Sequence, residues 1–199
     1  MKIIAIDTAT DVCGISYLID REIIHTIEDN IPRQHAKSLP LFYEKLCSET
    51  QLTLNNIDGI AVSIGPGSFT GLRIGLSYAK GLAFGCGLPI IPVPTLTAIM
   101  KSGEAFNGTA LAILYSHRDI VYAQRFKIND NTVNPDNEIA AYEWNKINPS
   151  FKELDLIVQI GCNDLIGKNN NIQSGYTSSS IIAQLANENF DEWVVDKPY

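Results

Sequence analysis

The chain opens with three short apolar runs separated by polar turns. Residues 3–6 are β-branched or small and end at the polar stretch 7–10, which is typical of a strand followed by a turn. A second apolar run covers 12–19, a charged turn follows at 20–22, and 23–27 forms the returning strand. Three strands before the first helix predict an antiparallel start to a sheet.

Helical and strand patterns then alternate up to about residue 101. Leu39, Phe42 and Leu46 share one face of a helix predicted from about residue 34 to residue 50. The almost uninterrupted apolar run 57–64 predicts a strand buried on both faces of a sheet. A helix to about residue 84, a strand at 88–93 and a helix at 96–101 follow. This order predicts an α/β fold with a mixed sheet covered by helices.

The second half begins with a small, polar stretch at 102–108 that we take as a domain boundary. We expect two subdomains, residues 1–103 and residues 104–199. The patterns of the second predict strands at 110–115, 120–126 and 154–160, loops at 129–137 and 167–171, and a helix at 178–189. Ser178, Ser179 and Ser180 supply N-cap candidates for that last helix.

Composition and charge narrow the class of protein. The 199 residues carry a formal net charge of −7, and 45% of them are hydrophobic, a globular balance. Neither half is basic, which argues against a chain that grips nucleic acid by itself. The four cysteines show no paired spacing, so we expect buried, free thiols. No apolar run is long enough for a membrane span, and we expect a cytoplasmic protein.

The segment 65–73, Gly-Pro-Gly-Ser-Phe-Thr-Gly-Leu-Arg, is the strongest candidate for chemistry. It joins a buried strand to a helix N-terminus, an arrangement whose amide groups suit an anion. The spacing is GxGxxxG, and no Lys-Ser or Lys-Thr pair follows, so neither the dinucleotide motif nor the P-loop is matched. A tight structural connection and a nucleotide contact through Gly65, Gly67 and Ser68 both stay open.

Asp7-Thr8-Ala9-Thr10 follows the first strand, where the actin–hexokinase–sugar-kinase superfamily places a phosphate-binding turn, Asp-x-Gly-Thr. Asp7 and Thr8 are therefore candidates for a nucleotide-proximal site. Ala9 stands where the superfamily has glycine, and its methyl group crowds the approach of a phosphate. We expect weak nucleotide affinity.

The helix after residue 69 has one ridge of almost bare backbone, formed by Gly71, Gly75, Ala79 and Ala83 at every fourth position. A glycine inside a helix costs about 1 kcal/mol relative to alanine, so something must approach this ridge closely. The ridge faces either the protein's own sheet or a partner helix. In the second case the neighbouring Leu72, Leu76, Tyr78 and Leu82 would flank the contact.

The sequence gives little support for a metal site or for the active site of a hydrolase. His35 opens the first helix, but Leu39 stands four residues later, where a second histidine would be needed for a metal pair. Ser68 lacks the GxSxG setting of a hydrolase nucleophile, and no cysteine has basic neighbours. We therefore expect no bound metal and no catalytic residues.

The motifs in this order resemble the bacterial TsaB (YeaZ) family. The matching stretches are IAIDTAT at 4–10, RQHAKSLP at 33–40, GPGSFTGLRIG at 65–75 and GLA at 81–83. Weaker matches are IVYA at 120–123 and the terminal 197–199. The resemblance implies an actin-like ATPase (ribonuclease H-like) fold of two related subdomains. It also implies a role in forming N6-threonylcarbamoyladenosine in tRNAs that read ANN codons.

Within that resemblance the chain would be a non-catalytic partner of TsaD, the subunit that transfers the threonylcarbamoyl group. The expected partner-binding surface combines the two helices: His35, Leu39, Phe42, Gly71, Leu72, Gly75, Leu76, Tyr78, Ala79 and Leu82. The resemblance further implies a TsaE-like ATPase as partner, a homodimer when alone, tRNA contact only through the complex, and a nucleotide shared at an interface. The alternatives are a self-sufficient nucleotide-dependent transferase or kinase and a glycoprotease-type peptidase.

Overall fold

The computed structural model describes residues 1–103, 106–130, 132–147, 154–166 and 171–196. The chain divides into two compact units, Met1–Thr95 with Thr177–Tyr199, and Leu96–Tyr176. The predicted division lay at residue 103 and left the C-terminus in the second unit. It is corrected because the C-terminal helix packs on the first sheet, where Ser178 and Ser179 donate hydrogen bonds to the Glu28 carboxylate.

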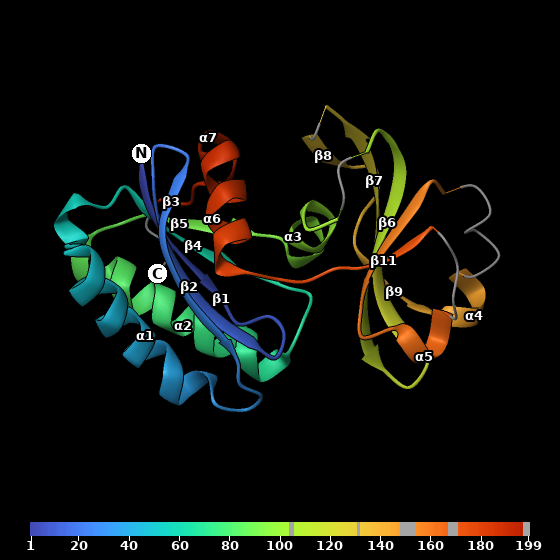
Figure 1. Cartoon of the computed structure of the whole chain (residues 1–199), viewed down its shortest axis with the longest axis horizontal. Coiled ribbons are helices and arrows are strands. Elements are labelled where there is room, and N and C mark those ends of the chain that lie inside the picture. The colour runs from blue at the N-terminus through green and yellow to red at the C-terminus, as the bar shows by residue number, and fades with distance from the viewer. Residues whose placement is uncertain (104–105, 131, 148–153, 167–170, 197–199) are drawn as a thin grey trace. The chain divides into compact units, whose positions relative to one another are not determined.

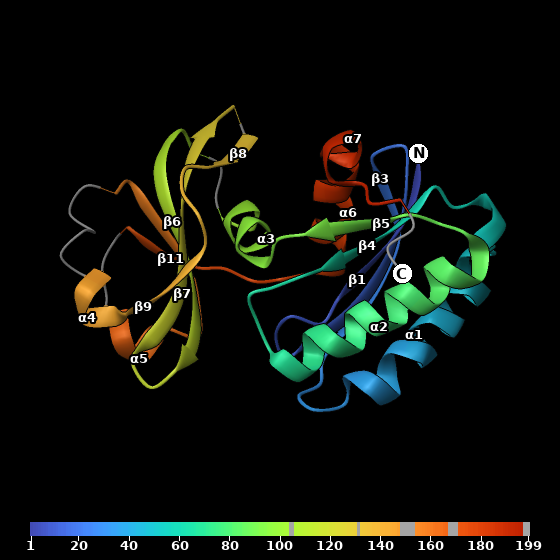
Figure 2. The same ribbon diagram turned by 180° about the vertical axis from the view of Figure 1, so that it is seen from behind.

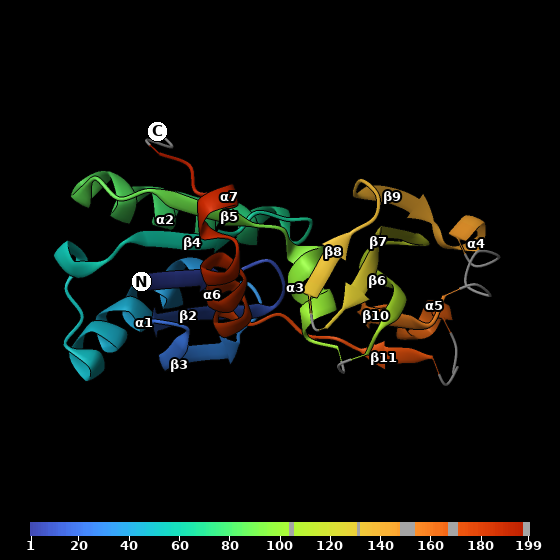
Figure 3. The ribbon, with the colours of Figure 1, turned by 90° about the horizontal axis from the view of Figure 1, so that it is seen from above.

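The first unit is built on one mixed sheet in the order β3-β2-β1-β4-β5. Its strands are β1 (Lys2–Asp7), β2 (Val12–Ile19), β3 (Glu22–Asn30), β4 (Gly59–Ser63) and β5 (Ile90–Val93). β1 pairs antiparallel with β2 and parallel with β4. In Figure 3 it is the dark blue strand between these two. The predicted antiparallel start and the buried strand near residues 57–64 are confirmed.

Helices cover both faces of this sheet. α1 (His35–Thr50) and α2 (Phe69–Cys86) lie side by side on one face, and α6 (Ser179–Glu188) lies on the other (Figures 1 and 2). A 3-10 turn (Leu54–Asn56) precedes β4, and the short α7 (Phe190–Trp193) follows α6. The Ser178 hydroxyl accepts the Ser180 N–H at 3.2 Å, so the predicted N-cap of α6 is confirmed.

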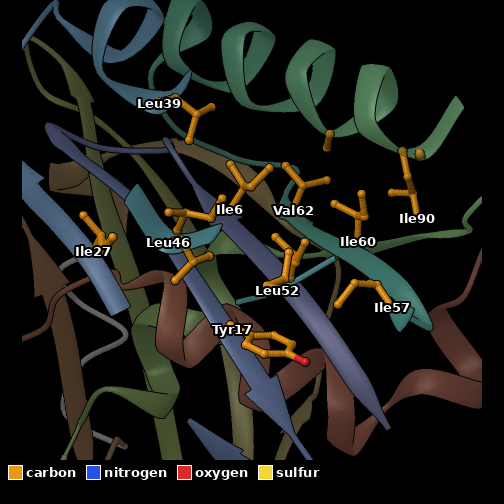
Figure 4. Close-up of a cluster of buried hydrophobic side chains, with 14 of the residues drawn as sticks. Ile6, Tyr17, Ile27, Leu39, Leu46, Leu52, Ile57, Ile60, Val62 and Ile90 are labelled. Carbon is orange, nitrogen blue, oxygen red and sulfur yellow. The ribbon is translucent and has the colours of Figure 1, made fainter. Parts of the chain in front are cut away.

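The core between the sheet and the α1–α2 pair fixes the direction in which both helices face. Leu39 and Leu46 of α1 are fully buried against Ile6, Ile60 and Val62 of the sheet, as Figure 4 shows. Ala79 and Ala83 of α2 belong to the same cluster, while Phe42, Leu76, Tyr78 and Leu82 pack at its margin. The face of α1 predicted from helical periodicity is therefore the face turned to the core.

The second unit contains α3, whose bounds are Thr95–Lys101, and a sheet in the order β11-β10-β6-β7-β8, with β9 also paired to β7. The strands are β6 (Gly108–His117), β7 (Ile120–Asn129), β8 (Thr132–Pro135), β9 (Ala140–Glu143), β10 (Leu156–Ile160) and β11 (Ile172–Ser174). The short helices α4 (Trp144–Ile147) and α5 (Asn163–Ile166) complete it. Two core clusters lie on opposite faces, one with Phe126 and Val158, the other with Trp144 and Ile157.

One predicted loop contains a strand, and two other predicted segments fall on residues that the structure does not describe. The polar stretch 129–137 contains β8, which pairs antiparallel with β7 between Phe126 and Pro135. An edge strand is held by backbone hydrogen bonds on one side and needs no apolar pattern. Residues 167–170 of the other loop and the terminal 197–199 lie outside the described residues. Among the described residues no helix is long and apolar enough to cross a membrane.

Candidate functional site

The loop before α2 lies directly on the turn that follows β1. A Cβ added at Gly67 would overlap the Ala9 carbonyl oxygen, and one added at Gly71 would overlap the Thr8 carbonyl oxygen. The Ser68 N–H donates to the Ala9 carbonyl at 2.7 Å. Backbone thus packs against backbone here, and glycine is required at both positions because any side chain would separate the two segments.

The same contact uses polar groups that a phosphate would need. The Gly65 N–H donates to Thr95 Oγ1 at 3.1 Å, and the Gly71 N–H donates to Ser68 Oγ at 3.2 Å. The Thr8 hydroxyl donates to the Gly71 carbonyl at 2.8 Å. These amide and hydroxyl groups are therefore bonded within the chain. Between the two interpretations left open, the geometry favours a tight structural connection, and weak nucleotide affinity stays a prediction.

Asp7 is the one member of the predicted nucleotide-proximal set with an unusual electrostatic environment. Its side chain is fully buried, Oδ1 accepts the Ala9 N–H at 3.1 Å, and Oδ2 has no hydrogen-bond partner. Burial raises the pKa of Asp7 above its ordinary value of 3.8; the Ala9 amide and the Ser63 and Thr177 side chains oppose this shift. A carboxylate here lacks the compensation that a buried charge requires.

His35 and Leu39, both predicted to bind a partner, lie inside the unit. His35 is 5% exposed. Its Nε2–H group donates to two carbonyl oxygens, that of Thr10 at 3.0 Å and that of Val12 at 3.2 Å. The ring thereby ties the start of α1 to the turn after β1. Leu39 is also fully buried, so both side chains contribute to the packing of the unit, and their partner-binding role stays a prediction.

The ridge Gly71, Gly75, Ala79 and Ala83 faces the protein's own sheet, which corrects its assignment to a partner interface. All four residues are buried, and a Cβ added at Gly75 would overlap Thr8 Oγ1. Helical periodicity identified the close contact correctly, but the backbone that makes it belongs to β1 and its turn. Leu72, Leu76, Tyr78, Leu82 and Phe42 are half-buried at the edges of this packing.

The outer surface of the α1–α2 pair carries a groove of about 560 Å³. It is lined by Ala36, Leu39, Pro40, Phe69, Thr70, Arg73, Ile74, Ser77 and Tyr78. Phe69 is 69% exposed, an unusual state for a phenyl ring, and the Tyr43 and Tyr78 rings meet edge to face with centroids 6.1 Å apart. Of the predicted partner-binding residues, only Leu39 and Tyr78 line this groove.

A second ridge of small residues continues from the groove along α2. Ser77, Gly81 and Gly85 recur at every fourth position, all three are exposed, and a Cβ at either glycine would meet nothing within 4 Å. This ridge lies two residues out of phase with the buried one. Phe69 and Arg73 continue this four-residue spacing toward the start of α2. Phe69, Arg73 and Ser77 were not among the predicted site residues, although the spacing can be found in the sequence.

Burial disfavours the thiolate form at two of the four cysteines. Burial raises the pKa of Cys13 and that of Cys162 to about 12, and all four cysteines are free. Cys86 at the end of α2 is exposed, contrary to the expectation of burial. Among the described residues no three His, Cys, Asp or Glu side chains gather as metal ligands, and the absence of bound metal stays a prediction.

Comparisons with known proteins find proteins that are named for the threonylcarbamoyl modification of tRNA. The family model described as "TsaD: tRNA N6-adenosine threonylcarbamoyltransferase" matches residues 23–156. The protein named tRNA threonylcarbamoyladenosine biosynthesis protein TsaB is 38% identical over 102 residues in Haemophilus influenzae, covering 51% of this chain and 43% of that protein. Its Escherichia coli namesake is 33% identical over 135 residues, covering 67% and 58%. The matched segments thus span about half of these relatives.

A solved structure establishes the fold over almost the whole chain. YeaZ from Pseudomonas aeruginosa superposes with a TM-score of 0.85 at 22% identity, covering 98% of this chain and 95% of that chain. A protein named tRNA N6-adenosine threonylcarbamoyltransferase, from Fusobacterium nucleatum, is 30% identical over 121 residues and covers 58% of this chain and 35% of its own length. The expected α/β fold of two units, each built on a mixed sheet, is confirmed.

Substituting the buried carboxyl group should stabilise the protein at neutral pH. Because folding raises the pKa of Asp7, its contribution to the free energy of unfolding is full below about pH 4 and is lost as the pH rises through the folded-state pKa. Asp7→Asn should therefore raise the melting temperature at neutral pH, and the gain should vanish near pH 4. Thermal unfolding across pH measures this, with exposed Asp11→Asn as control. A melting temperature lowered at neutral pH contradicts the prediction.

Adding bulk to the buried ridge should weaken the fold of the isolated chain. Ala79 is fully buried against the sheet, so Ala79→Leu overpacks the core and costs about 1–3 kcal/mol of unfolding free energy. Differential scanning calorimetry should show a melting temperature lowered by about 2–12 °C. An unchanged melting temperature would mean that the ridge has free space and that the assignment to the core is wrong.

Proposed function

The chain belongs to the TsaB (YeaZ) family, and on that premise we propose that it serves tRNA threonylcarbamoyladenosine biosynthesis as a non-catalytic partner of a TsaD-like transferase. Relatives carry that pathway in their names, and a transferase relative matches more than half of this chain. The observation that carries the non-catalytic part is the closed contact between the turn after β1 and the loop before α2.

That contact supports weak phosphate binding at the turn after β1, where the actin-like superfamily binds phosphate. The carbonyl groups of Thr8 and Ala9 point at Gly71 and Gly67 of the same chain, and the Ser68 amide is already bonded to Ala9. A phosphate in this turn would have to displace α2 from β1. Such a displacement would break the glycine-mediated packing on which the first unit depends, so the chain is poorly suited to transfer a phosphoryl group by itself.

The groove and the outer ridge on α2 support the partner role. Glycine in a helix costs about 1 kcal/mol relative to alanine, and nothing within the described part of the chain approaches Gly81 or Gly85. A helix from another subunit can approach closely at bare backbone, as in helix pairs with small residues at their contact. Exposed Phe69 and Leu41, on α2 and α1, add apolar surface for such a helix.

Reconstitution tests this function directly. The chain, its TsaD-like transferase and the other pathway proteins are incubated with tRNA, ATP, threonine and bicarbonate, and modified adenosine is measured after nuclease digestion. We expect modification only when both the chain and the transferase are present. We also expect no ATP hydrolysis and no casein degradation by the isolated chain. Modification by the chain without the transferase would identify a self-sufficient enzyme and overturn the proposal.

The outer ridge gives a variant that separates assembly from folding. Gly81→Leu places a side chain in open space on the isolated helix, so the melting temperature should stay the same or rise. In the complex the leucine should prevent close helix approach, which costs about 1–3 kcal/mol, or roughly 5- to 150-fold in affinity. Calorimetric titration against the transferase measures the dissociation constant.

Gln184→Leu is the matched control, because residue 184 is an exposed position of α6 on the opposite face of the sheet. The affinity of the Gln184→Leu variant for the transferase should equal that of the unmodified chain. Equal affinity for the Gly81→Leu variant would show that the outer ridge is not the contact.

A further inference from the structure

One side chain gives the groove its only charge. Among the residues that line it, Arg73 is the single ionisable cation and no acidic residue is present. The Arg73 guanidinium carbon lies 3.7 Å from the centre of the Phe69 ring, a cation–π contact between successive turns of α2. The stacking holds a planar guanidinium against the exposed ring at the groove.

Arg73 has no carboxylate partner among the residues that the structure describes. The ion pairs of these residues involve Met1, His25, Lys45, Lys127 and Lys146 as cations. The chain as a whole carries a formal net charge of −7, so an unpaired arginine in an apolar groove runs against the overall balance. The arginine is also oriented before any partner arrives, which reduces the entropy lost on binding.

A partner that covers the groove must supply a negative charge for Arg73. An apolar surface that removed water from Arg73 without supplying a counter-charge would leave a buried, unpaired cation, which is strongly unfavourable. A carboxylate satisfies the guanidinium through two parallel hydrogen bonds, while apolar neighbours of that carboxylate fill the space beside Pro40 and Ile74. The groove therefore selects for an acidic group set among apolar ones.

We propose that Arg73 is the specificity-determining residue of this surface and binds an aspartate or glutamate of the transferase partner, presented on an apolar helix. This inference rests on the proposed function. It adds the chemistry of the partner: one carboxylate facing Arg73, flanked by apolar side chains that enter the groove. Phe69 positions the guanidinium for that carboxylate.

Charge substitutions test the assignment. We expect Arg73→Gln to weaken binding of the transferase by at least about tenfold, because the partner's carboxylate would then be covered without a counter-charge. Arg73→Lys keeps the charge but loses the planar guanidinium group. The affinity of this variant for the transferase should therefore lie between that of the unmodified chain and that of Arg73→Gln. The affinity of the unmodified chain should decrease with rising salt, and this dependence should be weaker in Arg73→Gln.

Lys80→Gln is the matched control. Lys80 is an exposed cation on the same helix, it does not line the groove, and its substitution changes the net charge equally. We expect less than about a twofold change in affinity. Thermal unfolding of each variant alone checks folding, and exposed Arg73 should contribute little to the melting temperature.

The outcomes separate this inference from the proposed function. If the unmodified chain does not bind the transferase, the proposed function fails. If it binds and Arg73→Gln binds equally well with the same salt dependence, the proposed function stands and the inference is overturned. If Arg73→Gln disrupts only self-association, measured by analytical ultracentrifugation, the occupant is a second copy of this chain and the inference is overturned as well.

Discussion

The first unit depends on one contact, the backbone-to-backbone packing of the loop before α2 on the turn after β1. Gly67 and Gly71 lie against the Ala9 and Thr8 carbonyl groups, and Gly75 lies against the Thr8 side chain. Because these three positions carry no side chain, α2 approaches the sheet closely enough to bury Ala79 and Ala83 in the core. The same approach fixes how α2 is rotated about its axis, and hence which residues it turns outward.

This rotation links the closed turn to the outer surface. A helix that turns Gly71, Gly75 and Ala79 inward must turn Arg73, Ser77 and Gly81 outward, since residues two positions apart lie on opposite sides of a helix. The contact between the loop before α2 and the turn after β1 therefore also determines which residues of α2 line the exposed groove and ridge. The two parts of the proposed function, weak nucleotide binding and partner binding, thus rest on the same geometric feature.

The sequence patterns predicted those elements that are determined by residues close together in the chain. The apolar runs 12–19 and 23–27 predicted the hairpin, the spacing of Leu39 and Leu46 predicted α1, and Ser178 predicted a cap. The orientation of the α2 ridge was not predictable, because periodicity shows which residues share a face and not what that face contacts. The return of α6 to the first unit was not predictable, because its contacts, such as that of Ser178 with Glu28, join residues about 150 positions apart and leave no local signal. β8 was missed because Asn-rich edge strands carry no apolar alternation.

The energetics of Gly81 and Gly85 argue that the outer face has a purpose outside the isolated chain. Alanine at either position would fit without any contact and would stabilise the helix by about 1 kcal/mol. Gly71 and Gly75 need no such argument, since the Thr8 turn excludes a side chain from both. The inner glycines are thus explained by this fold and the outer ones are not. Among the described residues nothing contacts these two positions and no carboxylate pairs with Arg73, so a backbone from another molecule lying against them would account for the stability cost.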